Sequence, residues 1–195
     1  MVRALLILAA ANAALSIPMA MLVKRDFSKR GRVSIPMAVW TGAAMHGNAL
    51  LLLAIAWFDR GSLGAPSILT SAAGGFFAIA GAALIYLGRS AYADFSRVYG
   101  LKEDELIDRG VYRWSRNPQY VGYALFLGGV SLAALSVWAF VLTLSFALFI
   151  HCYIVSVEEP LLRAAFGRAY ESYLRQTARY FRPPSGRRND VNEKL

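Results

Sequence analysis

Two clusters of residues in the second half of the chain have the types and spacing that chemistry requires. The first is the run G-x-Y-x-x-x-R-N-P-x-Y-x-G at residues 110–122, in which Arg116 lies between Tyr112 and Tyr120. The second is the acid pair Glu158 and Glu159. An arginine can hold a carboxylate through charge-assisted, bidentate hydrogen bonds, and a carboxylate can hold an ammonium group or accept a proton. Together the two clusters indicate a reaction site.

Pro118 shapes the first cluster. Proline has no backbone N–H, and it biases the residue before it, Asn117, toward extended geometry. We therefore expect an exposed turn whose free amides and carbonyls can bind the polar groups of a ligand. A simpler interpretation stays open, in which residues 116–118 only begin a helix and Arg116, Tyr112 and Tyr120 belong to an interfacial belt.

The acid pair also allows two interpretations. Glu158 and Glu159 end an apolar span, where a charge is costly and tends to be functional when it faces a cavity. Alternatively, both acids begin the next helix, because carboxylates at a helix amino terminus interact favourably with its dipole and Pro160 suits a first turn. The two interpretations are compatible.

The elements that must position these residues are membrane helices. The chain is 57% hydrophobic with a mean hydropathy of +0.43, and its charges are gathered in blocks. A helix that crosses a bilayer needs about 20 predominantly apolar residues. Five stretches meet or approach this length, which predicts an all-α polytopic membrane protein: residues 2–23, 33–58, 67–88, 120–135 and 137–157. The fourth stretch is short, and we expect residues beside Pro118 to complete it.

The basic residues predict the topology. With the amino terminus outside, the segments 24–32, 89–118 and 158–195 face the cytosol and hold all of the 21 lysines and arginines except Arg3 and Arg60. Such an excess follows the positive-inside rule. We therefore predict a protein of the cytoplasmic membrane with its site and carboxyl terminus in the cytosol. A cleaved secretory signal at the first span is the alternative, although cleavage would leave the basic loop at 24–32 outside.

The net charge of +9 at pH 7 raises the question of a charged partner. Because the basic residues lie in juxtamembrane loops, we expect the lipid bilayer as the partner and no nucleic acid. The single cysteine, Cys152, excludes an internal disulfide and a cysteine-cluster metal site. The two histidines have no acidic partner nearby in sequence, so we predict no metal. Oligomeric state stays open.

We expect a single membrane-embedded domain at residues 1–183, followed by a disordered tail at 184–195 that is rich in Pro, Ser, Gly and charged residues. Small residues in the third span predict close helix packing at Gly74, Gly75, Gly81 and Ala82.

Two polar segments adjoin the predicted site. Residues 89–118 are too polar to span, and an acidic patch interleaved with apolar residues predicts an interfacial cap over a cavity. This patch comprises Glu103, Asp104, Glu105 and Asp108 with Leu101, Leu106 and Ile107. Residues 158–176 predict a surface helix with an apolar stripe at Leu162, Phe166, Ala169 and Tyr173.

In combination, these features resemble the superfamily of isoprenylcysteine carboxyl methyltransferases and phospholipid methyltransferases. The resemblance covers residues 85–183, and one span separates its two parts. It rests on Gly110, Tyr112, Arg116, Asn117, Pro118, Tyr120 and Gly122, followed by Glu158, Glu159, Phe166, Gly167, Tyr170, Tyr173, Arg179 and Pro183. The first two spans carry no signature of the superfamily.

The resemblance implies an integral-membrane enzyme that transfers a methyl group from S-adenosylmethionine to a lipophilic acceptor. It implies a cytosol-facing cofactor pocket, in which Arg116, Asn117 and Pro118 line the amino-acid end of the cofactor, and an acceptor that enters from the lipid. The other cofactor-binding residues that it implies are Tyr112, Tyr120, Glu158 and Glu159, with Tyr170, Tyr173 and Arg179 closing the pocket. Transfer would be a direct displacement that depends mainly on positioning. For an amine acceptor, Glu159 or Glu158 would be the catalytic base, provided that burial raises its pKa.

Two departures from the superfamily bear on the acceptor. Many of the carboxyl methyltransferases have histidine at the position of Asn117. Phospholipid methyltransferases have asparagine there, as this chain does. The carboxyl methyltransferases also tend to carry an arginine shortly before the acids, suited to an acceptor carboxylate, whereas residues 153–157 hold no cation. A phospholipid amine or another hydrophobic small molecule is therefore favoured over a prenylcysteine carboxylate.

Two other functions stay open. Sterol reductases share a similar Arg-His-Pro-x-Tyr segment, so an NADPH-dependent membrane reductase of a lipid double bond is one alternative. The other is a non-enzymatic lipid-binding membrane protein, in which Arg116 and the acids only anchor the topology. Cofactor binding separates the three.

Overall fold

The computed structural model describes residues 1–92 and 105–183. All regular elements in these residues are helical, as the sequence predicts. They are α1 (Val2–Arg30), α2 (Ile35–Phe58), α3 (Ile68–Ser90), the 3₁₀-helix η1 (Gly110–Arg113), α5 (Pro118–Ala134), α6 (Val137–Tyr153), the π-helix η2 (Ile154–Glu158) and α7 (Glu159–Gln176). The predicted tail at 184–195 lies outside the described residues, as do Leu101, Glu103 and Asp104 of the predicted acidic patch.

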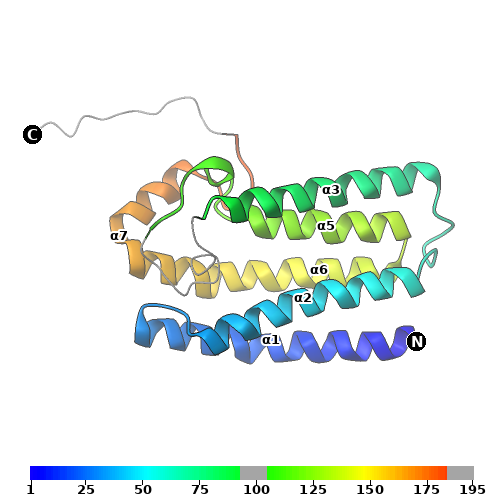
Figure 1. Cartoon of the computed structure of the whole chain (residues 1–195), viewed down its shortest axis with the longest axis horizontal. Coiled ribbons are helices and arrows are strands. Elements are labelled where there is room, and N and C mark those ends of the chain that lie inside the picture. The colour runs from blue at the N-terminus through cyan, green and yellow to red at the C-terminus, as the bar shows by residue number, and fades with distance from the viewer. Residues whose placement is uncertain (93–104, 184–195) are drawn as a thin grey trace, which may run out of the picture.

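Five long helices lie side by side in a bundle, and α7 turns across one end of it (Figure 1). Among the described residues, four helical stretches are long and apolar enough to span a bilayer: α1, α2, α3 and the continuous run from Val137 to Gln176. The remaining helix, α5, has 17 residues, which is the lower limit of about 17–25 residues for a spanning helix. It begins at Pro118, as predicted. The fold is that of a polytopic integral membrane protein.

The two ends of the bundle carry different segments (Figure 1). The amino terminus, residues 59–67 and the junction of α5 with α6 lie at one end, which we call the amino-terminal end. The loop after α1, residues 105–117 and α7 lie at the other end, which we call the pocket end. The described parts of the three segments that the charge pattern assigns to the cytosol therefore share one end.

α1 continues as a helix beyond its apolar span. The apolar span predicted from the sequence ends at residue 23, where the charges begin, but Lys and Arg are good helix formers and the helix runs on to Arg30. It stops at Gly31, which has a left-handed φ of 68°, and Asp26 Oδ2 accepts a hydrogen bond of 2.7 Å from Ser34 N. The extension brings the residues after 23 to the pocket end.

Glycines bring α3 and α5 into backbone contact. A Cβ atom at Gly81 would lie 2.4 Å from Phe126 N and 2.5 Å from Gly122 O. The same relation recurs two turns away, where a Cβ at Gly74 would lie 2.5 Å from Gly129 O. The predicted close packing is confirmed at Gly74 and Gly81, where the backbones of α3 and α5 meet, whereas a Cβ atom at Gly75 would meet nothing within 4 Å and Ala82 is exposed.

Asp59 joins two elements at the amino-terminal end of the bundle. Its Oδ2 atom accepts hydrogen bonds from Ser136 Oγ (2.6 Å), Ser62 Oγ (2.9 Å) and Trp138 N (3.2 Å), which join the loop after α2 to the start of α6. Burial raises the pKa of Asp59, but the hydrogen bonds from Ser136, Ser62 and Trp138 outweigh burial and hold the pKa below its ordinary value.

Candidate active site

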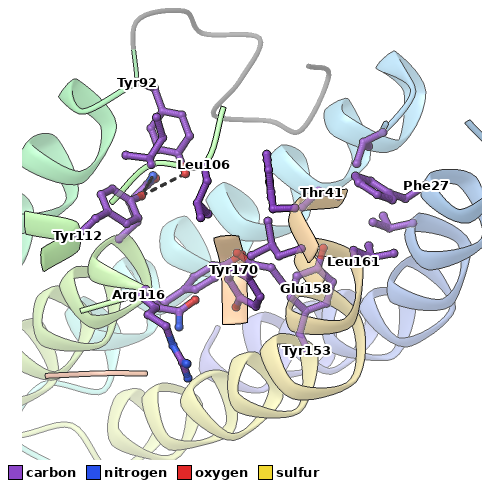
Figure 2. A pocket seen from close by; sticks show the side chains of 18 of the residues that line it. Phe27, Thr41, Tyr92, Leu106, Tyr112, Arg116, Tyr153, Glu158, Leu161 and Tyr170 are labelled. Carbon is purple, nitrogen blue, oxygen red and sulfur yellow. Dashed lines mark hydrogen bonds between the residues drawn. The ribbon is translucent and has the colours of Figure 1, made fainter. Parts of the chain in front are cut away.

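A pocket at the pocket end collects side chains from both halves of the chain (Figure 2). Most of the residues predicted from the sequence line it: Tyr112, Arg116, Asn117, Tyr120, Glu158, Tyr170 and Tyr173. Its volume is about 210 Å³. Small-molecule pockets typically measure about 300–1,000 Å³, so a ligand of cofactor size must extend beyond this cavity or widen it.

Glu159 lies behind the pocket wall and holds two arginines. Its Oε1 atom accepts hydrogen bonds from Arg116 Nη2 (2.9 Å) and Arg179 Nε (2.8 Å), and its Oε2 atom accepts one from Arg179 Nη2 (3.1 Å). The side chains of Arg116 and Glu159 are only 9% and 5% exposed. These hydrogen bonds from Arg179 to Glu159 raise the pKa of Arg179. Both oxygens of Glu159 are thus engaged, and Oε1 holds Arg116 in position.

Three polar atoms of the lining are buried and have no hydrogen-bond partner among the described residues: Arg89 Nε, Arg116 Nε and Glu158 Oε2. A buried polar atom left unsatisfied costs about 1–3 kcal/mol, and more when it is charged. Tyr120 and Tyr153 are neighbours of the Glu158 carboxylate. The pocket therefore brings together two arginines and one glutamate whose side chains each keep a polar atom without a partner in the described part of the chain.

Arg89 is a pocket residue that the sequence analysis did not single out. It lies in the last turn of α3, where a basic residue is explained equally well by the helix dipole and by the positive-inside rule. No motif marks it, and only the position of α3 beside α5 brings it to the pocket.

The turn at residues 115–117 is buried rather than exposed, which corrects the expectation drawn from Pro118. Asn117 is 6% exposed, and its N–H donates to Ser115 Oγ at 3.0 Å. Arg179 O accepts from Asn117 Nδ2 (3.0 Å) and from Ser115 Oγ (3.3 Å). Pro118 is also buried, outside the lining. The turn is covered by the segment after α7, so it supports Arg116 instead of offering free backbone groups.

Tyr112 joins the elements on the polar side of the pocket. Its hydroxyl donates to the Tyr92 hydroxyl at 3.3 Å, as Figure 2 shows, and accepts from Gln119 Nε2 at 3.0 Å. Tyr173 Oη donates to the carbonyl oxygen of Tyr112 at 2.7 Å. Burial raises the pKa of the Tyr112 hydroxyl, so this phenol stays neutral near pH 7.

A kink divides α7. Gly167 has φ 49° and ψ −121°, a combination that glycine adopts without the strain of a Cβ atom. Of the predicted apolar stripe, Leu162, Phe166 and Tyr173 line the pocket, whereas Ala169 is exposed and Tyr170, only 1% exposed, lies in the pocket instead. The 3.6-residue periodicity assumes a straight helix, and the kink rotates the second half away from it.

The pocket has an apolar half that the sequence analysis missed. Phe27 and Thr41 lie on one side of the pocket with Leu161, opposite Tyr92 and Tyr112 (Figure 2). The apolar half comprises Val23, Phe27, Val33, Ala38 and Met45 from α1, α2 and their loop, with Leu161, Leu162 and Phe166 from α7. Apolar residues within a span are expected to face lipid. No sequence signal distinguishes the apolar residues that line the pocket from those that face lipid.

The segment before η1 covers the pocket, as its acidic and apolar pattern predicts. Glu105, Leu106 and Ile107 belong to the lining, and Ile107 is 5% exposed. Arg109 Nη1 donates to Glu105 Oε1 at 2.7 Å. The described part of the predicted cap therefore lines the cavity.

The fold and the site together define a helical membrane protein with a polar, arginine- and glutamate-lined pocket at one end of its bundle. A family model for phospholipid methyltransferase matches residues 69–169, which is more than half of the chain. The chain belongs to the phospholipid methyltransferase family. This confirms the resemblance found in the sequence and makes the protein a membrane methyltransferase by family. Comparison with curated proteins and with solved structures gives no match.

Proposed function

We propose that the protein uses S-adenosylmethionine to methylate a phospholipid amine or another lipophilic acceptor, with its pocket facing the cytosol. The observation that carries this proposal is that Arg116 and Glu158 line one pocket and that Arg116 Nε and Glu158 Oε2 are buried without a hydrogen-bond partner among the described residues. Membership of a methyltransferase family supports the same function.

The residues present fit the amino-acid end of this cofactor. Arg116 would hold its carboxylate and Glu158 its ammonium group, because opposite charges in a buried site form the stronger, charge-assisted hydrogen bonds. Tyr112, Tyr170 and Tyr173 would provide aromatic faces for the remainder. When bound, the cofactor would supply an electrophilic methyl group. The residues of the chain then have to bind and orient the cofactor and the acceptor, and to exclude water.

The two acids receive different roles in this proposal. Glu158 is the acid with an oxygen free to contact a ligand, whereas Glu159 already accepts from Arg116 and Arg179 through both oxygens. We therefore assign ligand contact, and any proton acceptance from an amine acceptor, to Glu158. Glu159 and Arg179 support the cofactor site by holding Arg116.

The acceptor would occupy the apolar half of the pocket. A chain of methylene groups gains about 0.8 kcal/mol for each group buried there. Arg89, the third residue with a free atom, would interact with a phosphate of the acceptor. The basic loops beside the pocket support a cytosolic orientation, since they follow the positive-inside rule.

The test is isothermal titration of the detergent-purified protein with S-adenosylhomocysteine. The variants are Glu158→Gln and Arg116→Lys, of which the second keeps a cation beside Glu159. Arg175→Met is the matched control, because Arg175 is exposed in the last turn of α7. Loss of one charge-assisted hydrogen bond should weaken binding about 10- to 100-fold in the two pocket variants, with no change in the control.

Binding by the wild type that both pocket variants weaken would support the proposal. A folded wild type that does not bind S-adenosylhomocysteine would overturn it. A parallel titration with NADPH completes the design, because saturable NADPH binding would instead support the reductase alternative.

A further inference from the structure

A hydrogen bond joins the first helix to the π-helix beside the pocket. Lys24 Nζ, near the end of α1, donates to the carbonyl oxygen of Ser156 at 3.0 Å, although 132 residues separate the two in sequence. Lys24 lies outside residues 69–169, which the family model matches, and no motif of the sequence marks it. Its contact is with the element that carries Glu158.

The sequence explains why this carbonyl needs an outside donor. In an α-helix, the carbonyl of residue 156 accepts from the N–H of residue 160. Residue 160 is Pro160, which has no N–H. The helix here takes the wider π geometry, in which Glu159 N–H donates to Ile154 O, five residues back. In this i+5 register the N–H that Pro160 lacks would have bonded the carbonyl of Val155, next to Ser156, so Lys24 Nζ supplies a donor within the turn that proline interrupts.

This hydrogen bond lies close to Glu158, a residue of the pocket lining. Ser156 is two residues before Glu158, within the same π-helix. Such π-turns are rare and occur often at functional sites. Lys24 is also the first charge after the apolar part of α1, which places the bond near the edge of the bilayer, where less water competes for the carbonyl than in bulk solution.

We propose that Lys24 is a positioning residue: its ammonium group supplies a hydrogen-bond donor within the turn that Pro160 interrupts, ties α1 to the π-helix and holds Glu158 toward the pocket. The effect on cofactor affinity rests on the proposed function, while the effect on the π-helix does not. The competing explanation is that Lys24 acts only as a juxtamembrane charge. In that case its neighbour Arg25, which is exposed in the same helix, should be equivalent to it.

The experiment compares Lys24→Met, Lys24→Arg, Arg25→Met, Pro160→Ala and the double variant Lys24→Met/Pro160→Ala in the full chain. One readout is hydrogen–deuterium exchange of the amides in residues 154–162, which reports local opening of the π-helix. The other is the dissociation constant of S-adenosylhomocysteine from isothermal titration. Thermal unfolding confirms that each variant is folded.

Lys24→Met should speed exchange in 154–162 and weaken S-adenosylhomocysteine binding about five- to tenfold, as expected for one hydrogen bond from a charged donor. Arg25→Met should change neither readout, and Lys24→Arg should retain most of the wild-type behaviour. The double variant should recover the slow exchange, because an alanine in place of Pro160 has an N–H that can bond a carbonyl of this turn.

Equal effects of Lys24→Met and Arg25→Met would overturn the proposal, and so would a double variant in which the two losses simply add. If the wild type does not bind S-adenosylhomocysteine, the proposed function fails, and the exchange measurement still decides whether Lys24 holds the π-helix.

Discussion

Glu158 and Glu159 are adjacent in the chain, yet their carboxylates have opposite surroundings. Glu159 accepts hydrogen bonds from Arg116 and Arg179 at Oε1 and from Arg179 at Oε2, whereas Oε2 of Glu158 is buried without a partner among the described residues. One acid is therefore engaged within the protein, and we propose that the other contacts a ligand. The following predictions test this division and the scaffold behind it.

Glu159→Gln should destabilise the protein by about 3 kcal/mol, since removal of one partner leaves a buried arginine without its counter-charge. The measurement is the free energy of unfolding in detergent, which should be lower for the variant than for the wild type. The matched control is Glu171→Gln in the same helix, because Glu171 pairs with Arg163 at 3.0 Å while both side chains are 48% exposed. An exposed pair contributes less than about 1 kcal/mol. Equal losses in the two variants would contradict a structural role for Glu159.

Arg89→Met should affect the acceptor and not the cofactor. If Arg89 interacts with a phosphate, the variant should raise the KM for a phospholipid acceptor about tenfold, the typical effect of one charge-assisted contact. S-adenosylhomocysteine affinity should stay at the wild-type value. The measurement is methyl transfer to phospholipid in mixed micelles beside a titration with S-adenosylhomocysteine. A parallel loss of S-adenosylhomocysteine affinity would instead place Arg89 in the cofactor site.

Alanine substitution at two glycines of α3 should change the stability of the protein in opposite directions. Gly81→Ala places a Cβ atom 2.4 Å from Phe126 N, so it should destabilise the bundle by at least about 1–3 kcal/mol through overpacking. A Cβ atom at Gly75 would meet nothing within 4 Å, and Gly75→Ala should stabilise the helix by about 0.5–1 kcal/mol. Thermal unfolding of both variants in the same detergent checks this. A neutral Gly81→Ala would contradict the backbone contact.

Asp59 predicts a pH dependence of stability. Because its folded pKa is lowered from 3.8, its stabilising effect is complete above that value and disappears as the pH falls through the lower, folded pKa. Asp59→Asn should therefore be less stable than the wild type at pH 7, and the difference should shrink when both are unfolded near pH 3. A difference that is the same at both pH values would show that Asp59 does not titrate as described.

The sequence predicted the membrane helices and the convergence of the two clusters well, because both depend on local patterns. Apolar runs of bilayer length define spans wherever they occur, and Arg116 and Glu158 belong to short motifs at the ends of spans. The same patterns could not reveal the partners of Glu159, since an ion pair with Arg179 depends on how the segment after α7 folds back.

The remaining errors have a common origin in tertiary context. Pro118 indicated an exposed turn, but the later segment that carries Arg179 covers it. The stripe through Ala169 failed because Gly167 kinks the helix, and a single glycine in a sequence does not reveal its φ angle. Phe27 could not be singled out because an apolar side chain facing a pocket has the same chemistry as one facing lipid.

The glycine contacts between α3 and α5 have a consequence for how such proteins diversify. Backbone contact at Gly74 and Gly81 leaves that pair no room to vary, and the family-matched residues begin at this pair. The wall that faces it from α1 and α2 is built of ordinary side chains, which tolerate exchange of similar volume. Substitutions in α1 and α2 can therefore reshape the apolar half of the pocket while the contact between α3 and α5 stays unchanged.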